Sequence, residues 1–412
     1  MSLARSEPPR SPLVIVFVTV FIDLLGFGII IPLLPFYAET FGATALTVGL
    51  LSASFSLMQF IFAPIWGRLS DRIGRRPIIL LGLFGSFLSY LIFGLAQSLT
   101  VLFIARIAAG IAGANIPTAQ AFIADTTTPE NRAKGMGLVG AAFGLGFIFG
   151  PAVGGFLSQW GYAAPAFFAS ALSLANFCAA LFLLPESRTA AARQADAASA
   201  PQGRIDALRR ALARPHLPTL LLVYFIVIVA FSGFEATFAL FSERRFGFTA
   251  ATIGYMFAFV GFVLAIVQGT LVGRAARRLT ERRVVPMAIL LLAAGLGFIA
   301  VSRTVFFLTA ASGLIAVGMG FNNPSLVSLI SRLSSRDEQG GILGVSQSLA
   351  SLARVLGPAW GGFVFDRFGI AIPFLLASAL MFLAFVLSVL GLRHVHLARP
   401  VSVHNVASDV AG

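Results

Sequence analysis

Twelve long apolar stretches constrain this 412-residue chain more than any other feature of its sequence. A helix that crosses a bilayer needs about 20 mostly apolar residues, and the stretches are close to that length. They are too long, and too little alternating, for the strands of a membrane barrel. We therefore expect an all-α integral membrane protein with 12 transmembrane helices. The stretches cover residues 13–37, 45–66, 77–97, 100–122, 135–157, 163–184, 217–241, 251–272, 284–302, 305–330, 341–364 and 370–392.

The composition agrees with a lipid environment. Apolar residues make up 58% of the chain and charged residues 11%, whereas soluble proteins carry about 25% charged residues. A net charge of +13 would suggest nucleic acid in a soluble protein. Here we attribute it to basic loops, and we expect the lipid bilayer and no nucleic acid as a partner. The single cysteine, Cys178, and four scattered histidines give no metal-ligand pattern, so we expect no metal.

The distribution of Lys and Arg predicts the topology. With both termini on the cytoplasmic side, 23 of the 29 basic residues fall in cytoplasmic segments and 4 on the opposite face. Cytoplasmic loops of membrane proteins carry such an excess. We expect a multi-pass protein of the plasma (inner) membrane of a bacterium, with both termini cytoplasmic.

Four short motifs recur in the same order about half the chain apart. Residues 41–49 resemble 246–254, Gly67-Arg68 recurs as Gly273-Arg274, Gly113-x-Asn115-x-Pro117 as Gly320-x-Asn322-x-Pro324, and residues 150–155 as 357–362. The recurrence indicates a duplicated six-helix unit, which is typical of transporters with a central cavity near the bilayer midplane. We expect an N-terminal six-helix bundle at 1–184 and a C-terminal bundle with a short tail at 217–412. A cytoplasmic linker at 185–216 separates them, with a short amphipathic helix around residues 205–212.

Four ionisable residues lie inside the apolar stretches: Asp23, Arg106, Glu235 and Arg354. Such residues are costly in lipid, which makes each one a candidate functional group. Asp23 and Arg106 belong to the same half, and they form either a static ion pair or a pair that responds to a proton. Glu235 is either a proton carrier in a cavity or a wet residue near its mouth. We expect Asp23, Arg106 and Glu235 to couple transport to protons.

Aromatic and polar residues near these charges predict an apolar cavity with sparse polar groups, the kind that binds amphipathic organic molecules. For each aromatic residue alone, packing in the core or against lipid is the alternative. The candidate cavity residues are Phe27, Gln59, Asn115, Gln120, Phe234, Phe238, Phe241, Asn322, Asn323, Gln347 and Arg354.

Two further motifs complete the pattern. Residues 67–77 place four arginines and one aspartate between two apolar stretches, and Gly67, Asp71, Arg72, Gly74 and Arg75 form a candidate conformational latch loop. We expect Asp71 to meet the positive start of the helix near residue 341. In the fifth apolar stretch, small residues favour close helix contact and a proline bends the helix. Its motif residues are Gly144, Gly150, Pro151 and Gly154.

These residues resemble the major facilitator superfamily of transporters. Residues 67–77 are similar to its loop between helices 2 and 3, Arg106 to Gly113 to its helix 4 motif, and Gly144 to Gly155 to its antiporter motif. Asp23-x-x-Gly26-x-Gly28-x-x-x-Pro32-x-x-Pro35 resembles helix 1 of the 12-helix drug:proton antiporters. Leu184-Pro185-Glu186-Ser187 is similar to the end of helix 6 in the tetracycline-efflux branch.

The resemblance implies two pseudo-symmetric six-helix bundles and proton-coupled export of small amphipathic compounds, with tetracycline-like molecules among the candidates. Exporters of metal–tetracycline carry carboxylates in helices 3 and 9, whereas 77–97 and 284–302 contain none. Two alternatives are a proton-coupled importer of a sugar, organic acid or peptide, and a non-transporting receptor or assembly protein on the same scaffold. We expect no enzyme activity, no cofactor beyond the proton gradient, and a monomer.

Overall fold

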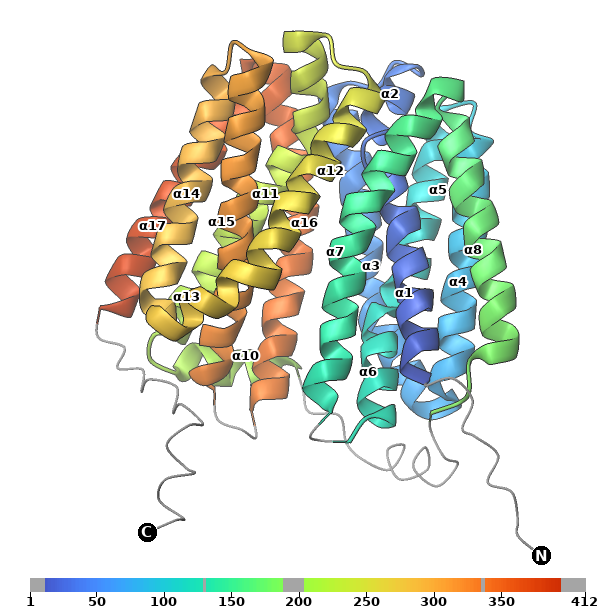
Figure 1. Ribbon diagram of the computed structural model, residues 1–412, viewed down its shortest axis with the longest axis horizontal. Helices are drawn as coiled ribbons and strands as arrows, with labels where there is room; N and C mark the ends of the chain where they lie inside the picture. The colour runs from blue at the N-terminus through green and yellow to red at the C-terminus, as the bar shows by residue number, and fades with distance from the viewer. Residues whose placement is uncertain (1–11, 129–130, 188–203, 335–337, 394–412) are drawn as a thin grey trace, which may run out of the picture.

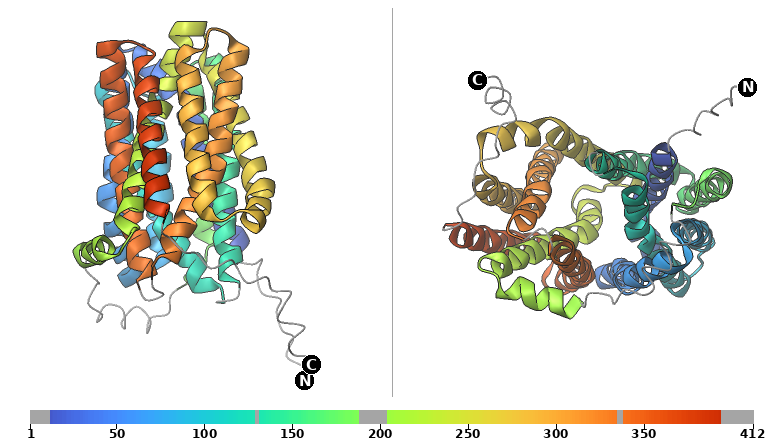
Figure 2. Two further views of the ribbon diagram at one scale, coloured as in Figure 1. Left: turned by 90° about the vertical axis from the view of Figure 1, so that its left-hand side faces the viewer. Right: turned by 90° about the horizontal axis from the view of Figure 1, so that it is seen from below.

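The computed structural model describes residues 12–128, 131–187, 204–334 and 338–393. All regular structure in these ranges is helical, and the long helices run side by side (Figures 1 and 2). The first half contains α1 (Pro12–Ile30), α2 (Leu34–Glu39), α3 (Ala45–Ile73), α4 (Arg75–Gly94), α5 (Leu99–Ala112), α6 (Ile116–Thr126), α7 (Arg132–Leu157) and α8 (Ala163–Leu183). The second half contains α11 (Leu217–Phe246), α12 (Ala250–Ile266), α13 (Val272–Arg278), α14 (Glu281–Val301), α15 (Val305–Arg332), α16 (Gln339–Phe368) and α17 (Ile372–Leu392).

Eleven helical spans in the described ranges are long and apolar enough to cross a membrane. The twelfth long helix, α16, falls short in hydropathy; it carries Gln347, Arg354 and Asp366. The expected all-α fold with 12 transmembrane helices is confirmed. The amphipathic helix expected around residues 205–212 is α10 (Arg204–Ala213). The boundaries at 184 and 217 stay a prediction.

Two helix pairs join the halves. α3 packs along α16, and α7 packs along α12. The duplication relates α3 to α12 and α7 to α16, so the two contacts are equivalent under the repeat. The same local chemistry starts both repeated helices, because Thr44 and Thr249 each accept a hydrogen bond from the backbone N–H three residues on, at 3.3 Å. These side chains satisfy one of the free N–H groups at a helix start.

The fourth apolar stretch is not one regular helix. It consists of α5, a 3₁₀ turn at Gly113–Asn115, and α6. Gln59 Nε2 of α3 donates a hydrogen bond to the carbonyl oxygen of Gly113, at 3.2 Å. A carbonyl released from the helical pattern is therefore satisfied by a neighbouring helix, as a bent helix in lipid requires.

Two ends of the bundle are distinguished by charge. The arginine-rich end carries the α3–α4 turn at Gly74 and the start of α16; the opposite end carries the start of α3 and the end of α16. At the opposite end the halves touch closely: a Cβ placed on Gly49 would lie 2.2 Å from the Pro358 carbonyl oxygen, and one on Gly254 2.4 Å from that of Pro151. Toward the arginine-rich end, helical glycines of both halves face open space: Gly67, Gly137, Gly140, Gly144, Gly269, Gly273, Gly340 and Gly344. At the opposite end, the glycines that face open space lie in turns, at Gly42, Gly161, Gly247 and Gly369.

Candidate functional site

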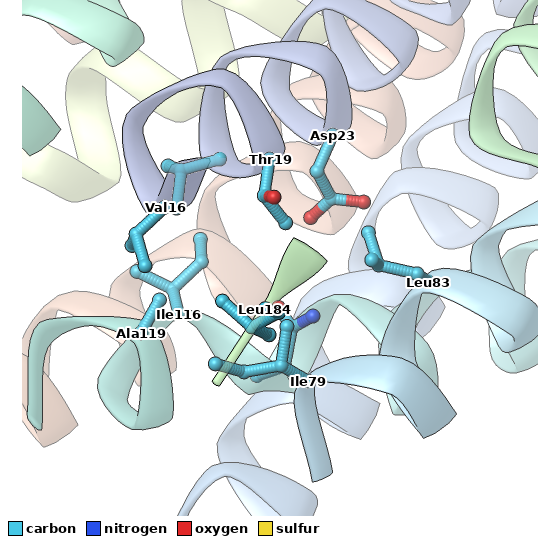
Figure 3. Close-up of a pocket in the computed structure, with 10 residues that line it drawn as sticks. Val16, Thr19, Asp23, Ile79, Leu83, Ile116, Ala119 and Leu184 are labelled. Atoms are coloured by element: carbon cyan, nitrogen blue, oxygen red, sulfur yellow. The ribbon is translucent and has the colours of Figure 1, made fainter. Parts of the chain in front are cut away.

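Asp23 of α1 lies inside the first half. Ser86 of α4 donates a hydrogen bond to its Oδ1 at 3.0 Å. The carboxylate lines a small cavity, shared with Thr19 and Asn115, whose remaining walls are aliphatic. Figure 3 shows Thr19 and Asp23 projecting from α1 toward Ile79 and Leu83 of α4. The cavity has room for about one water molecule.

Arg106 of α5 is 6% exposed. Its guanidinium lies over the ring of Phe55, 4.4 Å from the ring centroid, and Phe55 stacks on Phe27 of α1 at 5.1 Å. Within the described residues, Arg106 Nε has no hydrogen-bond acceptor. A cation held against an aromatic face and short of acceptors keeps capacity for a further anionic or polar partner.

Asp23 and Arg106 form no ion pair in the described part of the chain. Instead, both interact electrostatically with Tyr90 of α4, which packs against Gly26 of α1. A static ion pair, one of the two alternatives from the sequence, is therefore absent from this conformation. Tyr90 lies within electrostatic reach of both groups, but in the described part of the chain no hydrogen bond joins it to either of them.

The second half has a similar arrangement on different helices. Glu235 of α11 interacts electrostatically with Arg354 of α16, and Arg354 also interacts with Tyr224 of α11. Glu235 and Arg354 are both partly buried, and Tyr224 is buried. Each half thus places an acid, a tyrosine and an arginine inside the helical bundle. In the first half Tyr90 lies within electrostatic reach of both charged groups, whereas in the second half Arg354 lies within reach of Glu235 and Tyr224.

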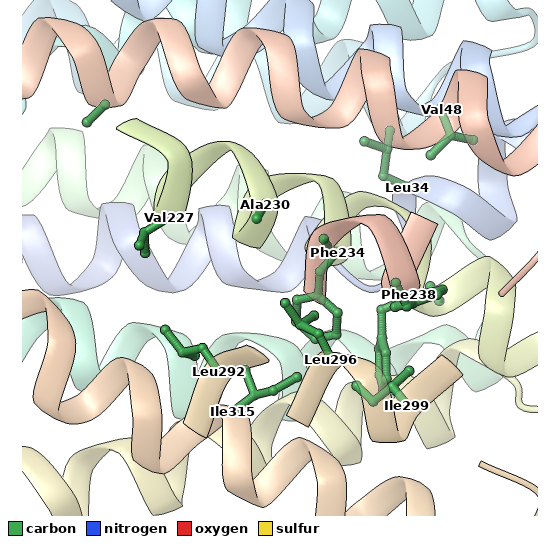
Figure 4. Close-up of a cluster of buried hydrophobic side chains, with 14 of the residues drawn as sticks. Leu34, Val48, Val227, Ala230, Phe234, Phe238, Leu292, Leu296, Ile299 and Ile315 are labelled. Atoms are coloured by element: carbon green, nitrogen blue, oxygen red, sulfur yellow. The ribbon is translucent and has the colours of Figure 1, made fainter. Parts of the chain in front are cut away.

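The candidate cavity residues separate into two groups. Phe234, Phe238 and Phe241 are 4%, 1% and 0% exposed, and their rings pack on one another and on Phe257 and Phe374. Figure 4 shows Phe234 and Phe238 among aliphatic side chains of the core. In this structure the three residues pack in the core, which was the alternative left open by the sequence, and their place in a substrate cavity stays a prediction.

The polar candidates lie at different depths. Asn115 is buried beside Asp23 within the first half, and Asn322 is buried with an Oδ1 that has no donor among the described residues. Gln120 is half-buried, whereas Asn323 and Gln347 are exposed. Gln347 lies seven residues before Arg354 on α16, so both share a side of that helix. Gly340 and Gly344, which face open space, lie on the same side.

The glycines of α7 mainly contact α1. Gly150 packs on Gly28, and Gly154 packs on the backbone of Ile29. Pro151 reaches both α1 and α12, because it contacts Gly28 and Gly254. The glycines and the proline of this motif therefore let α7 pack closely on α1 on one side. On its other side they let α7 pack closely on α12 of the second half. Gly144 faces open space.

The candidate latch loop folds around Arg75, which is 6% exposed. Its guanidinium contacts Asp71 at 2.7 Å, Ser70 at 2.6 Å and Asp125 of α6 at 3.2 Å. Glu186 accepts hydrogen bonds from the backbone N–H of Arg75, at 2.9 Å, and of the next residue. Acidic groups are favourable at a helix start, so Glu186 stabilises the beginning of α4.

Gly74 is required at this turn. Its φ of +113° is unusual for residues with a side chain, and a Cβ there would lie 2.2 Å from Glu186 Oε2. Gly67 faces open space and Arg72 is exposed. The expected contact between Asp71 and the start of α16 stays a prediction for a conformation closed at this end.

Sequence reasoning missed Asp366, at the end of α16. Its Oδ1 accepts a hydrogen bond from Ala45 N at 3.1 Å and its Oδ2 one from Leu46 N at 2.8 Å. A second contact between the halves lies nearby, where Arg244 of α11 approaches Glu39 of α2 at 3.4 Å. The available signal in the sequence was that residues 366–369 repeat the pattern Asp-Arg-x-Gly of residues 71–74. Ser86, Tyr90 and Tyr224 carried no signal, because single polar residues in apolar helices are common.

The fold, the buried charges and the duplicated halves define a polytopic membrane transporter. The sequence profile of the Major Facilitator Superfamily matches residues 16–280 and 269–408. The chain belongs to this family.

Relatives of known name are consistent with that assignment. "Multidrug resistance protein 2" of Bacillus subtilis (strain 168) is 34% identical over 372 residues, which cover 89% of this chain and 92% of that protein. "Tetracycline resistance protein, class E" of Escherichia coli is 36% identical over 352 residues, covering 85% and 86%. The crystal structure of the human organic anion transporter MFSD10 (TETRAN) superposes with a TM-score of 0.69 at 29% identity, covering 93% of this chain and all of that one.

Proposed function

We propose that this protein is a proton-coupled antiporter that exports small amphipathic organic compounds by alternating access. The observation that carries the proposal is that each half encloses an acid and an arginine among its helices, Asp23 with Arg106 and Glu235 with Arg354, with no ion pair between them in the described residues. Burying a charge without a matched partner is costly, so protonation of the acid changes the energy of its half substantially. A group of this kind links proton binding to conformation.

In the first half, ionised Asp23 is held by the Ser86 hydroxyl, and its charge acts on Tyr90. A proton on Asp23 removes that charge. Arg106, already short of acceptors, then lacks an anionic counterpart in its half and becomes more attractive to one in the substrate. Glu235 and Arg354 play the corresponding parts in the second half.

The arrangement of the halves supports alternating access. Close backbone contacts seal the opposite end, whereas small residues at the arginine-rich end face open space. We assign the arginine-rich end to the cytoplasm of a bacterial cell, because basic loops remain on that side of a membrane. This conformation then corresponds to one open to the cytoplasm, from which an exported compound enters.

The proposed substrate class rests on the side chains beside Arg106 and on the names of the relatives. Phe27 and Phe55 give an apolar and aromatic surface beside Arg106. The names of the relatives support multidrug or tetracycline-like substrates. A second candidate class is organic anions, favoured by Arg106 Nε without an acceptor among the described residues and by the likeness to a human organic anion transporter. Thermal stabilisation of the purified protein by cationic, zwitterionic and anionic amphiphiles separates the classes.

The coupling test uses purified protein in liposomes with a pH-sensitive dye. An outward-directed substrate gradient should drive protons in the opposite direction in the wild-type protein. Asp23→Asn and Glu235→Gln should each lower proton movement per substrate well below the wild-type value, because each removes a group that can carry a proton inside the bundle. Asp206→Asn, the same change on the exposed surface of α10, is the control and should leave coupling intact.

Three results contradict the proposal. Normal coupling in both variants would show that Asp23 and Glu235 do not carry the coupled protons. Proton and substrate moving in the same direction indicates an importer. Substrate binding without any flux indicates a receptor on the transporter scaffold.

A further inference from the structure

The helix α10 lies outside the two bundles and across the direction of the other helices. Figure 2 shows it at the arginine-rich end, along the outer rim of the second half. It packs on α16 and α11, and Ala211 is fully buried in that contact. Arg214, just after the helix, pairs with Glu338 at the start of α16. The helix is therefore fixed to the bundle by one side and by its end.

An adjoining side of α10 is apolar and uncovered by the described residues. Leu208 and Leu212 are 39% and 55% exposed. They are four residues apart, so they lie on one side of the helix, one turn from each other. In a protein that spans a membrane, an apolar side turned outward at the rim is positioned next to lipid and not next to water.

The remaining surface of α10 is basic. Arg209 and Arg210 are exposed and lie away from the two leucines around the helix. Together with Arg204 and Arg214 they place four arginines within eleven residues, directly before the transmembrane helix α11. A basic cluster next to a transmembrane helix attracts anionic lipid headgroups. Long arginine side chains reach phosphates while the apolar side stays in the acyl region.

We propose that α10 is a lipid-binding element that docks on anionic phospholipid headgroups of the leaflet at the arginine-rich end. Leu208 and Leu212 enter the upper acyl layer, and Arg209 and Arg210 bind headgroup phosphates. The partner is the lipid surface because only a bilayer offers both chemistries at this rim. Through Arg214 and Glu338, the bound helix holds the start of α16, the helix that carries Arg354 and Asp366. The inference is independent of the transported substrate and of proton coupling.

The test measures how deep α10 lies in the membrane. A nitroxide is attached to Leu212→Cys in a Cys178→Ser background, since Cys178 is exposed, and the full-length protein is placed in liposomes. One set contains phosphatidylcholine alone, and the other contains phosphatidylcholine with phosphatidylglycerol. Collision rates with oxygen, which enriches in lipid, and with a nickel chelate, which stays in water, report the depth of the label. A label at Ala213→Cys, on a different side of α10, serves as the polar reference.

In liposomes with phosphatidylglycerol, the label at position 212 should meet oxygen and be shielded from nickel, while the label at 213 should meet nickel. Arg209→Gln with Arg210→Gln should lower the membrane-bound population of α10 by about fivefold per arginine. The double change should have no effect in phosphatidylcholine alone. Arg282→Gln with Arg283→Gln is a matched control, because both residues are exposed at the start of α14, and it should not alter the depth of α10.

Three outcomes overturn the proposal. A label at position 212 that meets nickel in both lipid mixtures places the apolar side in water, available to a soluble protein. A label shielded from both probes places that side under another segment of the chain, such as residues 188–203. A label depth that is the same in both lipid mixtures would show that Arg209 and Arg210 do not bind anionic headgroups.

Discussion

Asp366→Ala should weaken the seal at the opposite end of the bundle without unfolding the protein. Asp366 is exposed, and its carboxylate accepts hydrogen bonds from the first backbone N–H groups of α3, which belongs to the other half. Those N–H groups have no acceptor within their own helix, as at every helix start. When the halves separate at this end, water replaces the carboxylate. The contact therefore contributes only to the closed conformation.

The expected change in the conformational equilibrium follows from this geometry. Removing a side chain that caps a helix start costs about 0.5–2 kcal/mol, typically ~1. Because Asp366 is exposed, the lower half of that range applies, and water offsets part of the loss. About 1 kcal/mol corresponds to a change of about fivefold in the equilibrium between the two conformations. Asp366→Asn keeps one acceptor oxygen and loses the charge, so its shift should be smaller.

The assay measures the separation of the halves at the opposite end. Nitroxide labels at Gln97→Cys and Arg303→Cys, in the Cys178→Ser background, lie on exposed loops of different halves. Electron–electron distance distributions should show a larger population of long distances in the Asp366 variants. Arg367→Gln is the control for a charge change beside the contact and should have no such effect.

A distance distribution that stays unchanged in Asp366→Ala would refute the reasoning, because it would show that backbone packing alone seals this end. An equal shift in Arg367→Gln would refute it as well, since it would point to general surface charge. A shift in melting temperature without a change in distances would assign Asp366 to stability of the fold and not to conformation.

Two further predictions concern the coupling groups and the interface. Tyr90→Phe should keep the fold and substrate binding but lower proton movement per substrate in liposomes, because the phenol hydroxyl lies within electrostatic reach of both Asp23 and Arg106; unchanged coupling would make Tyr90 a packing residue. Gly49→Val should trap the opposite end open, because a Cβ there would lie 2.2 Å from the Pro358 carbonyl oxygen. Labels across that end should then report long distances in nearly all molecules, and a wild-type distribution would contradict the assigned contact.

The sequence was sufficient for the fold because the bilayer limits the possibilities. The length and number of the apolar stretches predict the transmembrane helices. They do not predict the two irregular segments within them, the 3₁₀ turn at Gly113–Asn115 and the π-helical turn at Val267–Leu271. Periodicity alone did not show which side of a helix faces a cavity. Phe234 and Phe238 illustrate the problem, because a ring near a buried acid fits a cavity wall and a core equally well. Only the neighbouring helices decide between them.

The candidate site was predictable where charge was involved and not elsewhere. Asp23 and Arg106 stood out because buried ionisable residues are costly in lipid. Their actual partners, Ser86 for Asp23 and the ring of Phe55 for Arg106, depend on how α1, α3, α4 and α5 meet, which no local pattern encodes. Asp366 was missed because it lies at a helix end, where an acidic residue is ordinary. Its role as a hydrogen-bond acceptor becomes evident only from the structure, where the start of α3 lies beside it.

Only one of the two repeated interfaces has an aspartate at each of its ends, Asp366 and Asp71. α3 and α16 pack along each other, with the start of α3 at the end of α16. Asp366 ends α16 and caps α3 at one end of the bundle, and Asp71 ends α3 near the end where α16 begins. In the repeated α7–α12 pair, the sequence has Gln159 in place of Asp366 and Arg277 in place of Asp71. The duplication therefore preserved the packing at both interfaces but placed an aspartate at each end of only one. On this argument Asp71→Asn should shift the Gln97–Arg303 distances in the direction opposite to Asp366→Asn, since each aspartate stabilises the closure of its own end.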